Sequence, residues 1–274
     1  MKIQVLGPLH AEAGGLPAVP TAGKARQILA LLALHPGQVV PVAALRDEIW
    51  GPRPPRSAQT TLQTYILRLR RCLAAALGQD GAVRARQLLA TGHGGYLLRA
   101  DPADVDAFAF QRAARAGHEA FEDGDSERAA RLLREALALW RGPALVDVRT
   151  GSALRIQLVR LEESRLLAVE RRIDAELRLG LHGGLLAELR ELTERHPRDE
   201  RLHAQAMVAF YRSGRQAAAL ELYRRLRRGL VDELGIEPSP QLQRLHQAVL
   251  SVDPRLDVAA QGGRPTPTFD LYAA

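Results

Sequence analysis

The sequence predicts a mostly helical protein of two domains: a smaller α+β domain at the N-terminus and an all-helical repeat domain after it. Strand-like segments and glycine turns occur only before residue 100, and helical periodicity without strands follows from Val105 to about Leu250. The net charge divides at the same place. Residues 1–100 hold 12 basic and four acidic side chains, a net charge of +8, whereas the rest hold 26 basic and 27 acidic side chains, a net charge of −1. We therefore expect one domain to meet a polyanion and the other not to.

The first elements are short strands followed by a helix. An apolar run from Ile3 to Leu9 precedes a Gly14-Gly15 turn, and residues 16–19 are expected to return as a second strand. Apolar residues from Ile28 to Leu34 then recur at helical spacing until the Pro36-Gly37 stop.

Two more helices follow. The first runs from Val42 to Trp50 and ends at Gly51, and a cluster of prolines then forms a stiff turn. The second is long, from Ser57 to about Leu77, with one apolar face and an opposite face rich in hydroxyl, amide and arginine side chains.

A β-hairpin is predicted after the long helix, because residues 87–91 and 96–99 flank the turn sequence Gly92-His93-Gly94-Gly95. Two helices, a third with a polar outer face, and a hairpin make a helix-turn-helix with a wing. We place this winged helix-turn-helix domain at residues 1–100, with a boundary at residues 101–104.

The helical domain, residues 104–250, contains an internal repeat that starts at each of three glycines, Gly124, Gly180 and Gly214. In each copy the fifth, ninth and twelfth residues after the glycine are apolar. Gly180 and Gly214 are 34 residues apart, the period of the tetratricopeptide repeat, so we predict a tetratricopeptide-like domain. Residues 251–274, rich in proline and glycine, are expected to form a disordered tail.

The long helix carries the main functional signal. The major groove of DNA admits an α-helix, and threonine, glutamine and arginine can read base edges or meet phosphates there. Leu67, unusual on a solvated face, fits against a thymine methyl group. A plain solvated arginine face is the alternative, and the charge of +8 together with the hairpin favours DNA. The residues expected to contact DNA are Lys24, Arg26, Ser57, Thr60, Thr61, Gln63, Thr64, Leu67, Arg68, Arg70, Arg71, His93, Gly94 and Tyr96.

Two groups in that set have an equally good structural interpretation. Lys24 and Arg26 lie in the first turn of their helix, where free backbone N–H groups favour a phosphate, but they are as well explained as solvated surface. His93 at the hairpin tip could enter the minor groove or simply belong to a tight turn.

Other function classes lack a signal in the sequence. The lone cysteine, Cys72, allows no internal disulfide, and no apolar run reaches the length of a membrane span, so we expect a cytoplasmic protein located at the nucleoid. The eight histidines show no metal-ligand spacing, and no nucleophile motif is present. We expect no enzyme activity, no cofactor, no metal and no membrane association.

The order of the elements and several sequence blocks resemble the Streptomyces antibiotic regulatory protein family. The resemblance covers residue 1 to about 250. It rests on the blocks DEIWG, SAQTTLQTYILRLRRCL, GHGGYLLR, DAFAF, LWRGPAL and DELGIEPSPQLQRLHQAVL.

This resemblance implies an OmpR-type winged-helix domain followed by a bacterial transcriptional activation domain. It further implies that Ser57 to Leu77 is the recognition helix, with Thr60, Thr64, Arg68 and Arg71 outward, and that His93 to Tyr96 is the wing. The implied function is pathway-specific activation of a secondary-metabolite (antibiotic) gene cluster. The implied partners are direct repeats in double-stranded promoter DNA, a second protomer lying side by side on them, and RNA polymerase through its sigma factor.

One hypothesis of another class remains at this point. The chain could be a helical-repeat adaptor whose basic N-terminal domain binds RNA or an acidic protein. The chain has only five Tyr, five Phe and two Trp residues, and it lacks the interleaved aromatic residues that stack RNA bases.

Overall fold

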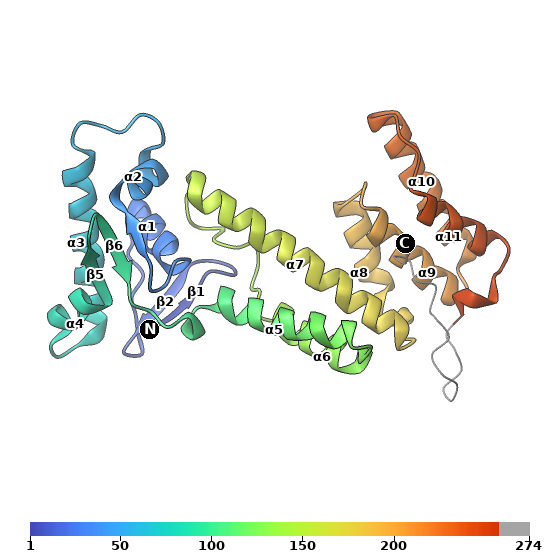
Figure 1. Cartoon of the computed structure of the whole chain (residues 1–274), viewed down its shortest axis with the longest axis horizontal. Helices are drawn as coiled ribbons and strands as arrows, with labels where there is room; N and C mark the ends of the chain where they lie inside the picture. The colour runs from blue at the N-terminus through green and yellow to red at the C-terminus, as the bar shows by residue number, and fades with distance from the viewer. Residues whose placement is uncertain (258–274) are drawn as a thin grey trace. The chain divides into compact units, whose positions relative to one another are not determined.

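The structure is a computed structural model that describes residues 1–257. The chain forms two compact units. The first contains Met1–Ala116 and Arg134–Ala168, and the second contains Gly117–Leu133 and the chain from Val169 onward. Each unit is described by itself below, and Figure 1 labels the elements.

The first unit opens with a three-stranded antiparallel sheet of β1 (Lys2–Gln4), β2 (His10–Ala13) and β3 (Leu16–Pro17). The predicted single strand before Gly14 is therefore two strands. The reason lies in the backbone N–H groups between them, which are taken by carboxylates: Val5 and Leu6 donate to Asp106 at 2.7 and 3.1 Å, and Leu9 donates to Asp147 at 2.8 Å. Val5, Leu6 and Leu9 thus have their N–H groups taken and Pro8 has none, so the segment between the strands has few donors for a ladder.

Three helices and a second sheet complete the winged helix. The helices are α1 (Gly23–Ala33), α2 (Val42–Trp50) and α3 (Ala58–Leu77), within a residue or so of the predicted α2 and α3 bounds. The sheet has the order β4 (Val39–Pro41), β6 (Gly95–Leu98), β5 (Leu89–Gly92). Ile28, Leu45 and Leu62 meet in the core with less than 2% of their surface exposed.

One helix was not predicted. α4 (Gly81–Leu88) occupies residues that the sequence assigned to a loop and to the start of the hairpin, so strand β5 begins at Leu89 rather than at Gln87. The sequence of α4 has little apolar periodicity, and its apolar residue Val83 is exposed in the structure. Gly81 permits the packing: a Cβ there would lie 2.2 Å from the carbonyl oxygen of Ala74 in α3.

A carboxylate of the winged helix accepts hydrogen bonds from the start of a long helix. α7 (Ser152–Arg178) begins where the sequence predicted a long helix. The buried side chain of Glu48 in α2 accepts bonds from the backbone N–H groups of Gly151, Ala153 and Leu154, the last two at 2.9 and 3.1 Å. Gln27 also donates to the Glu48 carboxylate at 2.9 Å. Glu48 thereby satisfies N–H groups that the first turn of α7 leaves without helical partners.

Before α7 come the short 3-10 helix η1 (Pro102–Asp104), α5 (Asp106–Glu122) and α6 (Ser126–Leu137). The Trp140 ring meets Phe110 edge to face at 5.5 Å between ring centroids, and Arg165 lies over the Trp140 ring at 4.6 Å. Through these contacts Trp140 packs inside the first unit.

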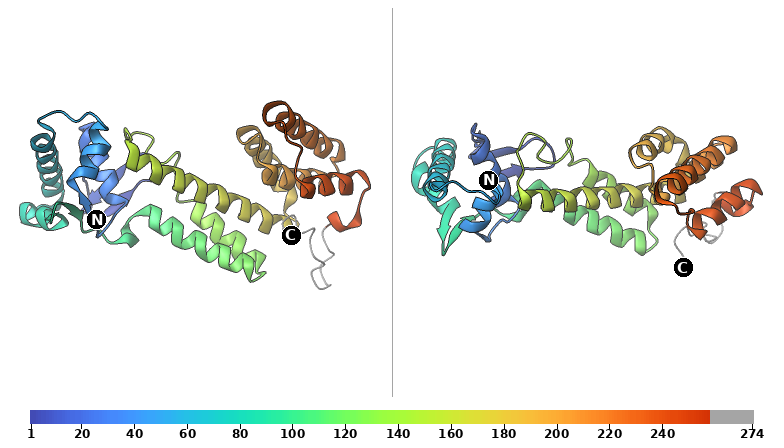
Figure 2. Two further views of the ribbon diagram at one scale, coloured as in Figure 1. Left: turned by 45° about the horizontal axis from the view of Figure 1, so that its top comes forward. Right: turned by 90° about the horizontal axis from the view of Figure 1, so that it is seen from above.

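The second unit continues with α8 (His182–Arg195), α9 (Glu200–Arg212), α10 (Gln216–Leu234) and α11 (Pro240–Leu250). α9 packs against both α8 and α10, and the further views follow the same stack (Figure 2). This arrangement of helix pairs is that of a helical repeat domain.

The predicted repeat is confirmed by backbone conformation and burial. Gly124, Gly180 and Gly214 each end a helix with a positive φ of 82°, 76° and 72°. Eight of the nine aligned apolar residues are buried, namely Ala129, Leu133, Ala136, Leu185, Leu189, Ala219, Tyr223 and Leu226, and the ninth, Leu192, is half-buried.

Buried charges join α7 to α9 within the second unit. The Arg201 guanidinium lies 3.2 Å from the Glu170 carboxylate and 2.8 Å from that of Asp174, and Gln205 donates to Asp174 at 2.6 Å. Burial raises the pKa of Glu170 from 4.5 to about 7, although Arg201 acts in the opposite direction.

The prediction of a disordered tail from residue 251 onward is wrong for residues 251–257. Residues 251–257 are placed: the short 3-10 helix η2 (Pro254–Leu256) ends in a fully buried Leu256, whose carbonyl accepts a 2.6 Å bond from Arg212. The remainder of that prediction lies outside the described residues. No helix among residues 1–257 is long and apolar enough to span a membrane.

Candidate nucleic-acid interface

The outer face of α3 is the centre of the candidate interface. Its apolar side (Ala58, Leu62, Ile66, Leu69, Leu73 and Ala76) is buried in the first unit. The opposite side is exposed and consists of Gln59, Thr60, Gln63, Thr64, Leu67, Arg68 and Arg71. Leu67 is 47% exposed, as expected for a residue of this face. A helix with one face fixed in the core and the other open can enter a groove of a duplex.

The exposed side chains of α3 differ in the donors that they have free. Within residues 1–257, the side chains of Gln63, Arg68 and Arg71 make no hydrogen bond or ion pair. The Thr64 hydroxyl donates to the Thr60 carbonyl at 3.1 Å, so it is left as an acceptor. Thr61 is only half-exposed, and Ser57 is exposed at the N-cap of the helix.

Arg70 has two of its five donors engaged within the fold. Its Nε donates to the Leu89 carbonyl at 3.0 Å, and one Nη donates to the Thr91 hydroxyl at 2.9 Å. Both acceptors lie on β5, so Arg70 fixes the hairpin against the recognition helix. It is therefore suited to positioning the wing.

The two cations at the start of α1 also have partners in the fold. Lys24 donates to the Ile49 carbonyl at 3.3 Å and lies over the Trp50 ring at 5.0 Å. Burial and the nearby Arg149 lower the pKa of Lys24. Arg26 forms an ion pair with Asp147. A phosphate contact by either residue would have to compete with these interactions.

The hairpin of β5 and β6 presents a glycine tip. Gly94 has a φ of 73°, and His93 beside it is exposed. Tyr96 is only 8% exposed and pairs with Val40 in the sheet, so its ring is part of the wing's packing. A Cβ on Gly95 would lie 2.2 Å from the Val40 carbonyl oxygen, which explains a glycine at that position.

Three exposed residues were not among the predicted contacts: Arg53 and Arg56, which precede α3, and Gln59, which lies on this face. The first two lie in the proline-rich loop that leads into α3. Two arginines directly before the N-terminus of a recognition helix are the signal that could have identified them. Cys72 lies half-buried on α3, and burial raises its thiol pKa, which argues against a reactive thiolate.

Comparisons with known proteins agree with this architecture. Residues 105–250 match the family described as "Bacterial transcriptional activator domain", and residues 17–97 match "Transcriptional regulatory protein, C terminal". The regulatory protein DnrI of Streptomyces peucetius is 52% identical over 94% of this chain and 94% of its own length. The transcriptional regulator RedD of Streptomyces coelicolor is 39% identical over 94% of this chain and 73% of its own length.

A solved structure is similar throughout the fold. The structure titled "Mycobacterium tuberculosis EmbR in complex with low affinity phosphopeptide" superposes with a TM-score of 0.83 at 35% sequence identity. The match covers 92% of this chain and 65% of that one. A winged helix whose α3 has an exposed outer face, a helical repeat domain and these relatives agree, and the chain belongs to the Streptomyces antibiotic regulatory protein family of transcriptional regulators.

Proposed function

We propose that this chain binds direct repeats in duplex promoter DNA through α3 and the β5–β6 wing, and activates a secondary-metabolite (antibiotic) gene cluster. The observation that carries the proposal is the open face of α3, on which Gln63, Arg68 and Arg71 have no competing partner within the described chain. Such side chains can pair with base edges or phosphates without first breaking a bond in the protein.

The proposed division of labour follows the two sequence domains. Residues 1–100 read the DNA, and residues 104–250 form the activation domain that contacts proteins. Two protomers lie side by side, so the direct half-sites should be separated by about one helical turn, roughly 10–11 bp, or a multiple of it.

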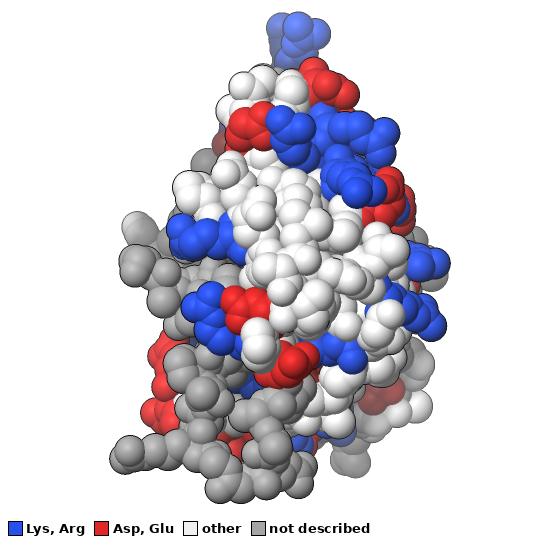
Figure 3. Space-filling view, turned by 90° about the vertical axis from the view of Figure 1, so that its right-hand side faces the viewer, with Lys and Arg blue, Asp and Glu red and all other residues white. Residues whose placement is uncertain are grey.

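The helical domain has a surface suited to proteins. Seen from the end with α10 and α11, an uncharged area is bordered by basic and acidic side chains (Figure 3). Exposed Leu234, Ile236 and Leu250 come from these helices and their connection. Few charges in the centre of a patch, with exposed apolar side chains and a polar rim, are typical of protein interfaces. The proposed protein partner is RNA polymerase, contacted through its sigma factor. We further propose that the chain acts in the cytoplasm at the nucleoid and has no enzyme activity.

The first experiment measures the affinity of the full chain for duplex DNA from promoters near its gene. Footprinting should reveal protected direct repeats. Arg68→Ala should weaken binding, by about 1 kcal/mol or more if the guanidinium reads a base. Arg244→Ala, an exposed arginine of α11, is the matched control and should leave the affinity unchanged.

The same assay distinguishes duplex DNA binding from the adaptor hypothesis, in which the basic N-terminal domain binds RNA or an acidic protein. Single-stranded RNA is added as competitor to the duplex complex. Preference for the RNA, or equal loss of binding in the Arg68→Ala and Arg244→Ala variants, would contradict recognition of duplex DNA by α3.

A further inference from the structure

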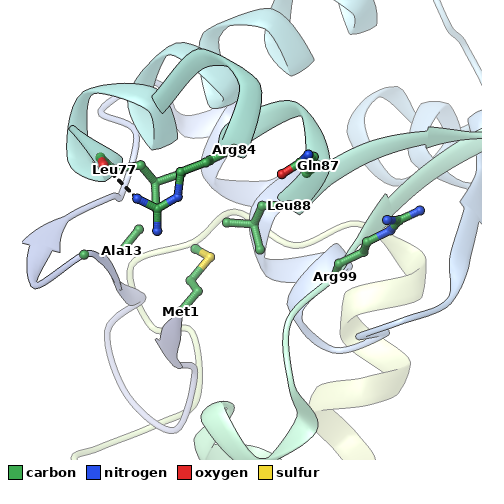
Figure 4. Close-up of a pocket in the computed structure, with 8 residues that line it drawn as sticks. Met1, Ala13, Leu77, Arg84, Gln87, Leu88 and Arg99 are labelled. Carbon is green, nitrogen blue, oxygen red and sulfur yellow. Dashed lines mark hydrogen bonds between the residues drawn. The ribbon is translucent and has the colours of Figure 1, made fainter. Parts of the chain in front are cut away.

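A cavity of about 480 Å³ opens in the first unit beside α4 (Figure 4). Its volume lies within the range of small-molecule sites. The walls come from distant parts of the sequence: the β2–β3 turn, the end of α3, helix α4 and the segment after β6. The cavity therefore exists only in the folded domain.

The floor of the cavity is apolar. The Met1 side chain is almost fully buried, and Leu77 and Leu88 are half-buried beside it. The N-terminal ammonium group of Met1 pairs with Asp104 at 3.1 Å, so its charge is already balanced. Leu77 and Leu88 are the part of this floor that remains open, and they can contact the hydrocarbon part of a ligand.

The rim carries two positive charges. Arg84 and Arg99 lie on either side of Met1 and Leu88 (Figure 4). Arg84 donates one bond to the Leu77 carbonyl, at 3.3 Å, and Arg99 makes no side-chain bond or ion pair among the described residues. No acidic side chain lines the cavity. Both guanidinium groups are exposed, so a ligand anion meets them without displacing a carboxylate.

We propose that this cavity binds an anionic small molecule with an apolar body, such as a carboxylate or sulfonate on a ring system, and that its occupancy is coupled to DNA binding. An apolar floor beside two arginines that have no carboxylate partner in the cavity matches that chemistry. A DNA backbone would use the arginines but has no apolar body for the floor, so it is the less favoured occupant.

The coupling follows from the position of the cavity. Leu77 is the last residue of α3, and Arg99 directly follows β6 of the wing. A ligand that contacts both changes the free energy of their relative placement, and duplex DNA would contact the same two elements. This second part of the proposal rests on the proposed DNA-binding function, whereas the first part does not.

Binding is tested without DNA, using the fluorescence of 8-anilinonaphthalene-1-sulfonate with the full chain. We expect one saturable site. Arg84→Gln and Arg99→Gln should each raise its Kd by about three- to fivefold, and the double variant by about tenfold, since the pairs are partly solvated. Arg86→Gln, an exposed arginine of α4 outside the cavity, is the matched control for charge.

A neutral probe of the same shape, N-phenyl-1-naphthylamine, tests the role of the anion. Its binding should not respond to the arginine substitutions. If the double variant binds the sulfonate as tightly as the parent chain, or if Arg86→Gln causes the same loss, the site assignment is wrong. Unchanged circular dichroism and Tm show that the variants are folded.

The coupling is tested with the duplex found by footprinting. A saturating sulfonate probe should change the Kd for DNA, and saturating DNA should change the Kd for the probe by the same factor. An unchanged Kd for DNA overturns the coupling alone. If the double variant loses DNA affinity in the absence of any probe, the arginines are phosphate contacts and the small-molecule assignment fails.

Discussion

At the level of single residues, the basic side chains of the first unit differ in whether they already have a hydrogen-bond or ion-pair partner in the fold. Lys24, Arg26 and Arg70 each have an acceptor or a carboxylate within the unit. Arg68 and Arg71 have none among the described residues. A side chain that must break a hydrogen bond forfeits about 0.5–1.5 kcal/mol before it gains a new partner. The free arginines are therefore the better candidates for DNA contacts.

Gln63 is the residue of α3 best placed to read a base. Its exposed amide carries both a donor and an acceptor, the pair that recognises adenine in the major groove. We expect Gln63→Ala to reduce the preference for the best half-site by about 1–3 kcal/mol while nonspecific affinity is retained. Competition binding with single-base variants of the half-site measures this. Gln79→Ala, in the loop after α3, is the control, and an equal effect of both substitutions would contradict a reading role for Gln63.

Glu170 predicts a pH dependence of stability. Burial raises its pKa to about 7 in the folded chain, above its ordinary 4.5, so its contribution to stability is fully present below pH 4.5 and is lost as the pH rises through about 7. The difference corresponds to about 3 kcal/mol. Glu170→Gln resembles the protonated form and does not titrate. It should match the parent near pH 4.5 and become more stable than the parent by up to about that amount at pH 7.5.

Urea unfolding at the two pH values measures this difference. Burial lowers the pKa values of His118 and His203, which act on stability with the opposite sign, so the comparison with the parent chain isolates Glu170. Glu163→Gln, an exposed carboxylate on the same helix, is the control. A constant difference between parent and Glu170→Gln would show that this carboxyl does not take up a proton in the interval.

At the level of elements, the sequence predicted those whose signals are local. The glycine stop and apolar spacing of α2 and α3, and the glycine register of the repeats, depend on neighbours in the chain. α4 was missed because its stability comes from packing of Gly81 against the backbone of α3, which no local period reports. The outer face of α3 was predictable because helical spacing in the local sequence defines it together with the core face. The sequence could not predict that Arg26 and Arg70 already have partners, because those partners, Asp147 and Leu89, are distant in sequence.

Glu48 tests how strongly α2 and α7 depend on one another. Its buried carboxylate accepts from the backbone N–H groups of Gly151, Ala153 and Leu154 at the start of α7, and from Gln27. Glu48→Gln places an amide donor among these donors and removes the negative charge. We expect it to lower the free energy of unfolding by about 2–4 kcal/mol, and to speed amide exchange in the first turn of α7.

The neighbouring Asp47→Asn change provides the comparison for Glu48. Asp47 is exposed on the same helix, so its substitution should change stability by no more than about 0.5 kcal/mol. Urea unfolding and hydrogen exchange measure the two effects separately. Equal exchange rates at residues 151–154 in both variants would mean that Glu48 does not hold the start of α7.

At the level of the whole molecule, the charge of +8 in residues 1–100 is only partly available to DNA. Acidic side chains or carbonyls of the same unit engage Lys24, Arg26 and Arg70, and Arg84 bonds to a carbonyl. The exposed arginines on and just before α3 are Arg53, Arg56, Arg68 and Arg71. On the proposed DNA-binding face, the general electrostatic argument therefore becomes four candidate phosphate or base contacts per protomer, while Lys2, Arg46, Arg86 and Arg99 lie outside α3 and the loop before it.

This number sets the salt dependence of binding. Four neutralised phosphates predict that log K for nonspecific duplex DNA falls against log salt with a slope of about −4 per protomer. Arg71→Ala should reduce the magnitude of the slope by about 1 and weaken all sequences alike, because a phosphate contact does not distinguish bases. Anisotropy titrations at several salt concentrations measure the slope, with Arg244→Ala as the control that keeps it. A slope near −8 would show that cations of residues 1–100 beyond these four also contact DNA, and a slope near zero would contradict electrostatic binding by this face altogether.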